Sequence, residues 1–239
     1  VALLMIGNLR GLRESGRIFS VPTYVFIVGA LALLGAGLWH VATGTVTPVT
    51  VPDPVPLGAS PLTLFLVLTA FSNGCTAMTG VEAVSNGVPA FRAPEARNAA
   101  TTMVIMAGLS IAMFLGITWL AHAYGIVPSA SETVLSQLAR GAFGGRNTAY
   151  YVVQAGTMAI LVLAANTAYA DFPRLASILA RDGYVPRQLA NQGDRLAFSN
   201  GIIGLSVFAA VLLVIFGGDT HALIPLYMIG VFVSFTLSQ

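Results

Sequence analysis

Long apolar segments, separated by short stretches that carry most of the charge, dominate the pattern of this chain. A helix needs about 20 apolar residues to cross a bilayer, and six segments have roughly that length. The predicted spans cover residues 20–40, 62–90, 99–124, 149–171, 199–217 and 222–239. They are too long and too continuous for barrel strands, which alternate over about 10 residues. The pattern therefore predicts an all-α, polytopic membrane protein with about six transmembrane helices.

Composition supports lipid as the solvent for most of the chain. Hydrophobic residues make up 56% of its 239 residues and charged residues only 8%, whereas soluble domains carry about 25% charged residues. This excludes soluble enzymes, nucleic-acid-binding proteins and disulfide scaffolds as leading interpretations. The single cysteine, Cys75, forms no internal disulfide. We expect no resident cofactor.

The arginines predict the orientation of the spans, because all eleven basic residues are Arg. Nine of them fall on one side of a six-span arrangement: Arg10, Arg13, Arg17, Arg92, Arg97, Arg174, Arg181, Arg187 and Arg195. The other side holds only Arg140 and Arg146. The positive-inside rule then places both ends of the chain in the cytoplasm of a plasma or inner membrane. Both ends are apolar, and we expect this chain to be an internal piece of a longer membrane protein.

The connecting segments predict local structure of their own. Five prolines within residues 43–61 indicate an extended outer loop. Ser129 and Glu132 have capping-box spacing before an apolar set, which predicts a short amphipathic outer helix that ends near Gly141. On the inner side, residues 175–179 form a second amphipathic stripe that ends at Gly183, a residue typical of a helix C-cap.

A few polar residues in or near the spans receive structural interpretations. Asn166 and its neighbour Thr167 are expected to hydrogen-bond between helices. Ion pairs are expected between Asp171 and Arg174 and between Arg181 and Asp182. The small residues of 29–37 allow close helix packing.

The second predicted span is unlike the others. It contains Gly74, Gly80, Gly87 and Pro89 among several polar residues, and it is longer than a crossing requires. Extra length with internal glycines predicts two half-helices joined by an unwound stretch around residues 78–81. Broken helices of this kind provide carbonyl groups and helix ends as ligands at the midplane of transporters.

Glu82 is the most informative residue of that span. A carboxylate near the bilayer centre costs a few kcal/mol, so it faces a cavity, pairs with another group or becomes protonated. A carboxyl group removed from water holds its proton more readily, which is what a proton carrier needs. Two alternatives stay open. Glu82 could bond a neighbouring helix in a purely structural role, or the span could be residues 64–80 and leave Glu82 at the cytoplasmic edge.

Two long motifs resemble a known family. Residues 71–100, which include Ser85-Asn-Gly-Val-Pro89, resemble the sixth helix and following loop of the amino acid–polyamine–organocation (APC) superfamily. Residues 171–186, which begin Asp171-Phe-Pro-Arg174, resemble its segment after helix eight. The complete sequences of these two motifs, together with residues 8–16, are most similar to those of the KimA-like, KUP-type potassium importers. The similarity covers essentially the whole chain.

The resemblance implies that the six spans are helices five to ten of a LeuT-type fold. It also implies that Thr79 and Glu82 lie at the potassium and proton site, joined by Tyr227 from the tenth helix. The chemistry agrees, because potassium binds oxygen dipoles. A hydroxyl (Thr79), unwound carbonyls near Gly80 and a phenol (Tyr227) provide such oxygens, although a packed aromatic is an equal interpretation of Tyr227.

The resulting hypothesis is a secondary transporter that couples potassium uptake to protons. Proton-coupled uptake of an amino acid by the same fold is the alternative. Some related permeases use a lysine as proton carrier, and this chain has no lysine. An intramembrane enzyme is disfavoured because no histidine lies deep in a span, and a passive channel because of the buried carboxylate. The sequence is compatible with a homodimer.

Overall fold

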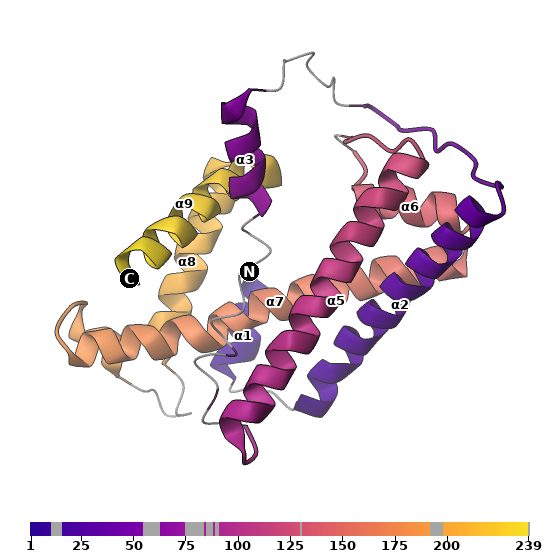
Figure 1. Cartoon of the computed structure of the whole chain (residues 1–239). Coiled ribbons are helices and arrows are strands. Elements are labelled where there is room, and N and C mark those ends of the chain that lie inside the picture. The colour runs from indigo at the N-terminus through magenta and orange to yellow at the C-terminus, as the bar shows by residue number, and fades with distance from the viewer. Residues whose placement is uncertain are drawn as a thin grey trace. The chain divides into compact units, whose positions relative to one another are not determined.

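A computed structural model describes residues 1–10, 16–54, 63–74, 84, 88, 91–129, 131–191 and 198–238. These residues confirm an all-α chain, with one isolated β-bridge between Pro54 and Ser129. The elements are α1 (Ala2–Leu9), α2 (Gly16–Ala42), α3 (Leu64–Gly74), α5 (Glu95–Ala123), α6 (Val134–Ala142), α7 (Thr148–Arg181), η3 (Arg187–Ala190), α8 (Ser199–Ile215) and α9 (Thr220–Ser238) (Figure 1).

Three of the helices in the described part of the chain are long and apolar enough to cross a membrane by length and composition. They are Ser20–Ala42 within α2, all of α5 and all of α7. Shorter apolar helices coincide with the other predicted spans, at Leu64–Gly74, Ser199–Ile215 and Ala222–Ser234. The chain is therefore a polytopic membrane protein, and the number of six crossings stays a prediction.

The chain divides into two compact units. The first unit contains Val1–Val46 and Ala139–Gly218, and the second contains Thr47–Leu138 and Asp219–Gln239. Each unit joins segments that are distant in sequence, so both depend on long-range helix packing.

In the first unit, α7 is the central helix and contacts α2, α8, α1 and η3. The α2–α7 contact uses a glycine from each helix. A Cβ atom on Gly29 would lie 3.3 Å from the side chain of Val153, and one on Gly156 would lie 3.4 Å from the backbone of Phe26. Small residues let helix backbones approach closely in lipid, which confirms the packing role expected for the glycine-rich stretch at Gly29.

The contact between α7 and α8 combines close packing with a buried hydrogen bond. A Cβ atom on Gly201 would lie 2.8 Å from Cβ of Pro173 and 3.0 Å from its Cα atom. Further along the same pair, the Ser206 hydroxyl lies 3.1 Å from the hydroxyl of Tyr169, and both residues are buried. These two contacts hold α8 against α7.

We expect Gly201→Ala to destabilise the protein by about 1–3 kcal/mol, because the added methyl group overlaps Pro173. Gly204→Ala is the matched control, since Gly204 lies on the same helix with nothing within 4 Å of the position of its Cβ atom. Thermal unfolding of the full-length protein in detergent measures both. Equal melting temperatures for the two variants would contradict the close contact.

The C-terminal part of α7 confirms one expectation and corrects another. The helix runs through the predicted amphipathic stripe of residues 175–179 and ends at Arg181, and Gly183 adopts the φ of 85° that a glycine C-cap requires. No ion pair joins Asp171 to Arg174 or Arg181 to Asp182 within the described part of the chain. All four side chains are exposed, and ion pairs at exposed positions contribute little free energy.

In the second unit, the segment that follows α2 packs against the segment between α5 and α6. The proline-rich segment is non-helical over residues 45–54, where the Val49 amide donates to the Tyr124 carbonyl at 3.4 Å. The amphipathic helix is confirmed as α6, but its predicted cap is wrong. Thr133 Oγ1 accepts from the Ser136 amide at 3.3 Å, whereas Ser129 Oγ donates to the Pro52 carbonyl.

Candidate functional site

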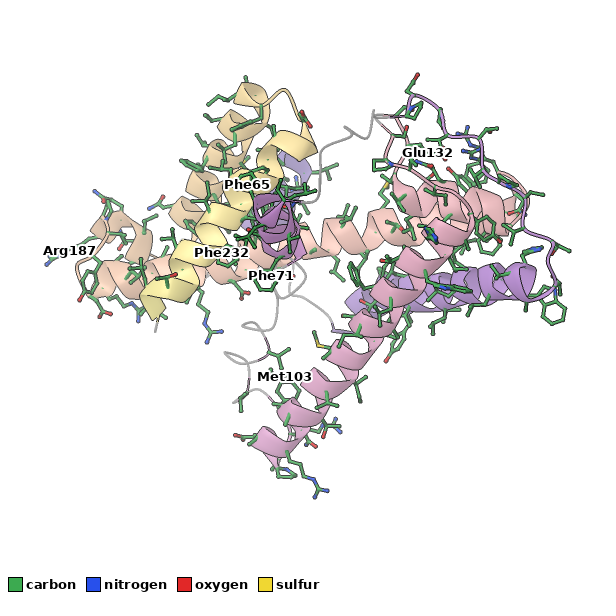
Figure 2. All side chains as sticks on the ribbon, turned by 45° about the horizontal axis from the view of Figure 1, so that its top comes forward. Phe65, Phe71, Met103, Glu132, Arg187 and Phe232 are labelled. Carbon is green, nitrogen blue, oxygen red and sulfur yellow. The ribbon has the colours of Figure 1, made fainter. Side chains whose placement is uncertain are left out.

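The predicted broken span and the predicted tenth helix meet in the second unit. Helix α3 contains the first part of the broken span and packs against α9. The hydroxyl of Ser72 on α3 donates to the sulfur atom of Met228 on α9 at 3.7 Å. Figure 2 shows Phe65 and Phe71 of α3 in the same region as Phe232 of α9. The chain just before residues 75–83 is thus held beside the middle of α9.

Tyr227 lies at that place, directly before Met228. Its side chain is 48% exposed, whereas Met228 is buried at 9%. Of the residues predicted to form the site, Thr79, Gly80 and Glu82 lie outside the described residues. The composition of the site stays a prediction.

The predicted broken helix is described only in parts. Helix α3 covers Leu64–Gly74, and Val84 and Val88 have helical and 3₁₀ backbone, respectively. The predicted unwound stretch at residues 78–81 lies outside the described residues. Helix α5 begins at Glu95, after a cis peptide bond between Ala93 and Pro94.

In the first unit, a hydrogen bond joins two asparagines, of which only Asn166 was predicted from the sequence. The Asn8 side-chain amide on α1 donates to Asn166 Oδ1 on α7 at 2.7 Å and to the Leu4 carbonyl at 2.9 Å. This confirms an interhelical bond for Asn166, whereas Thr167 Oγ1 donates to the Leu163 carbonyl of its own helix at 3.2 Å. Asn8 was not predicted as the partner, although a polar asparagine in an apolar segment is typical of a residue that bonds between helices.

We expect Asn166→Leu to destabilise the full-length protein by about 1 kcal/mol, because interhelical hydrogen bonds in membranes contribute about that much. Thr167→Val on the next residue is the control, since it removes a bond within one helix. Chemical denaturation in mild detergent compares the two. The same loss in both variants would show that Asn166 does not join α1 to α7.

The described residues contain no group of three or more His, Cys, Asp or Glu side chains able to hold a metal ion. A potassium ion requires no such group, because hydroxyl and carbonyl oxygens replace its weakly held water. The residues predicted for the site are of this neutral kind, with a single carboxylate beside them.

Comparison with known proteins identifies the family. A family model described as amino acid permease matches residues 1–239. The chain is 52% identical over 239 residues to the potassium transporter KimA of Bacillus subtilis (strain 168). That match covers 100% of this chain and 39% of the relative, so the chain spans about two fifths of the relative's length. This chain belongs to the amino acid permease family of the APC superfamily.

Proposed function

We propose that this chain is the part of a secondary transporter that forms helices five to ten and takes up potassium together with protons. The observation that carries the proposal is the 52% identity, over every residue of this chain, to a protein named as a potassium transporter. Identity at this level preserves the helices and their packing, so both proteins can present ligands to an ion at the same places in the fold.

In this proposal Thr79, the carbonyl of Gly80 and the Tyr227 phenol bind the ion, and Glu82 carries the proton. Thr79 and Glu82 are three residues apart, which places them on one face of any regular helix. The packing of α3 on α9 supports the addition of Tyr227 to this group. Neutral oxygens suit a cation that has to leave the site again after it binds.

Amino acid uptake by the same fold is the second candidate, and it is favoured by the description of the family model. An amino acid needs donors for its carboxylate as well as acceptors for its ammonium group. The oxygens proposed for this site fit a cation better.

Potassium uptake tests the proposal directly. The full-length protein that contains this chain, expressed in a strain lacking its own potassium importers, should restore growth at low potassium and take up the ion faster at lower external pH. Uptake of a labelled amino acid by the same cells is the second measurement. Amino acid uptake without potassium uptake would replace the proposal by its alternative.

The arginine distribution further supports a plasma-membrane location with residues 10 and 181 on the cytoplasmic side. We expect a cysteine substituted for Arg181 to be protected from an impermeant maleimide in intact cells. A cysteine substituted for Arg146, just before α7, should react. Because Cys75 is the chain's own cysteine, both variants carry Cys75→Ala. The opposite labelling pattern would reverse the orientation.

A further inference from the structure

One exposed apolar face of α7 runs without a break from the membrane span into the segment beyond Asp171. Within the span, no charged residue occurs from position 148 to 170, about 35 Å of helix, which is enough to cross the hydrocarbon core of about 30 Å. The exposed positions then recur every three or four residues on one side of the helix, namely Leu161, Ala164, Ala168, Phe172, Leu175 and Leu179.

Beyond Asp171 the large apolar side chains face outward and the small ones face the protein. Leu175, Ile178 and Leu179 are 53%, 49% and 45% exposed. The buried side of the same turns contains Pro173, Ala176, Ser177 and Ala180. The segment is anchored, because η3 and α8 both pack against α7.

Arginines border this apolar stripe. Arg174 and Arg181 are seven residues apart, which places them on one side of α7, about 10 Å from each other along its axis. Both are exposed, and neither forms an ion pair with Asp171 or Asp182 in the described structure. Figure 2 shows Arg187, in η3, with its side chain directed away from the helices.

An exposed aromatic ring completes the surface. Tyr184, in the turn after α7, is 79% exposed, and its amide donates to the Leu179 carbonyl at 2.9 Å. Tyrosine is enriched at the level of lipid headgroups, where its ring and its hydroxyl meet different environments.

We propose that residues 172–187 bind an anionic phospholipid, with its acyl chains on Leu175, Ile178 and Leu179 and its phosphate on Arg174 and Arg181. Continuity of the apolar face with the candidate membrane span, together with the arginines that border it, indicates lipid as the occupant. Guanidinium groups bind phosphate through paired hydrogen bonds, and these two have no competing carboxylate partner among the described residues.

The fluorescence of a tryptophan introduced at position 184 can report which lipid lies against residues 172–187. The full-length protein carries Tyr184→Trp, with Trp39 and Trp119 replaced by Phe, in vesicles of phosphatidylcholine. Brominated phosphatidylglycerol or brominated phosphatidylcholine is added at equal mole fraction, and quenching gives their relative affinities. We expect stronger quenching by phosphatidylglycerol, and a preference about fivefold lower for each of Arg174→Gln and Arg181→Gln.

Arg146→Gln is the matched control, because Arg146 is exposed at the opposite end of α7 and its loss should leave the preference unchanged. A second test leaves the arginines unchanged and varies the salt concentration. A high concentration of NaCl should reduce the preference for phosphatidylglycerol, because salt screens charges at the surface. Equal quenching by the two lipids, or a preference unaffected by Arg174→Gln and Arg181→Gln, overturns the proposal. Quenching by neither lipid also overturns it, since protein would then cover this face.

Discussion

Replacing Glu82 by glutamine should leave a protein that reaches the membrane but no longer raises potassium uptake when the external pH falls. Glutamine has nearly the shape of a protonated glutamate and cannot release a proton, so it removes only the titration. Coupling between two ligands of one protein is typically about 1–3 kcal/mol, or about 5–150-fold. We therefore expect pH-driven uptake to fall by at least about fivefold, measured as initial rates over a series of external pH values.

Glu95→Gln is the control for this experiment. Glu95 is an exposed carboxylate in the first turn of α5, outside the proposed site, and its variant should keep the pH dependence of the parent protein. An unchanged pH profile in Glu82→Gln would remove Glu82 as the proton carrier. It would also favour the two structural interpretations of this residue over the transport mechanism.

The helices were predictable because their determinants are local. Apolar stretches of sufficient length must satisfy their backbone groups internally in lipid, and the end of α7 follows from Gly183, which adopts a φ of 85°. The start of α6 was less predictable, because Thr133 and Ser129 are both able to cap a helix. The long-range contact of Ser129 with Pro52 decided between them.

Packing directions were harder to predict, and the C-terminal end of α7 shows why. In water, an amphipathic stripe of Leu175, Ile178 and Leu179 would face the core. In lipid, no hydrophobic force drives large side chains between helices, and close backbone approach selects small ones. Pro173 accordingly meets Gly201, and the side chains of Leu175, Ile178 and Leu179 are exposed.

The residue types of the candidate site stay a prediction drawn from local signals, and their geometry does not follow from those signals. An acidic residue inside an apolar span is a local signal, and it is the reason why Glu82 is predicted as the proton carrier. The place of Tyr227 depends on how α9 packs against α3, and that contact joins residues 156 positions apart in the chain. No pattern in either segment alone specifies such a contact.

Thr79→Val and Tyr227→Phe should each raise the KM for potassium about tenfold, because each removes one oxygen ligand of an ion that has lost part of its water. If both oxygens bind the same ion, the two losses will not add. A double-mutant cycle on KM at fixed pH should give an interaction free energy of about 0.5–3 kcal/mol.

Matched controls separate this effect from general damage. Thr69→Val lies in the same predicted span, where Thr69 Oγ1 donates to the Phe65 carbonyl of its own helix at 2.8 Å. Tyr24→Phe alters an exposed tyrosine of α2. Both should leave KM unchanged. Strictly additive effects of Thr79→Val and Tyr227→Phe would mean that the two residues act on potassium at different places, and Tyr227 would then be a packing aromatic of α9 rather than a ligand.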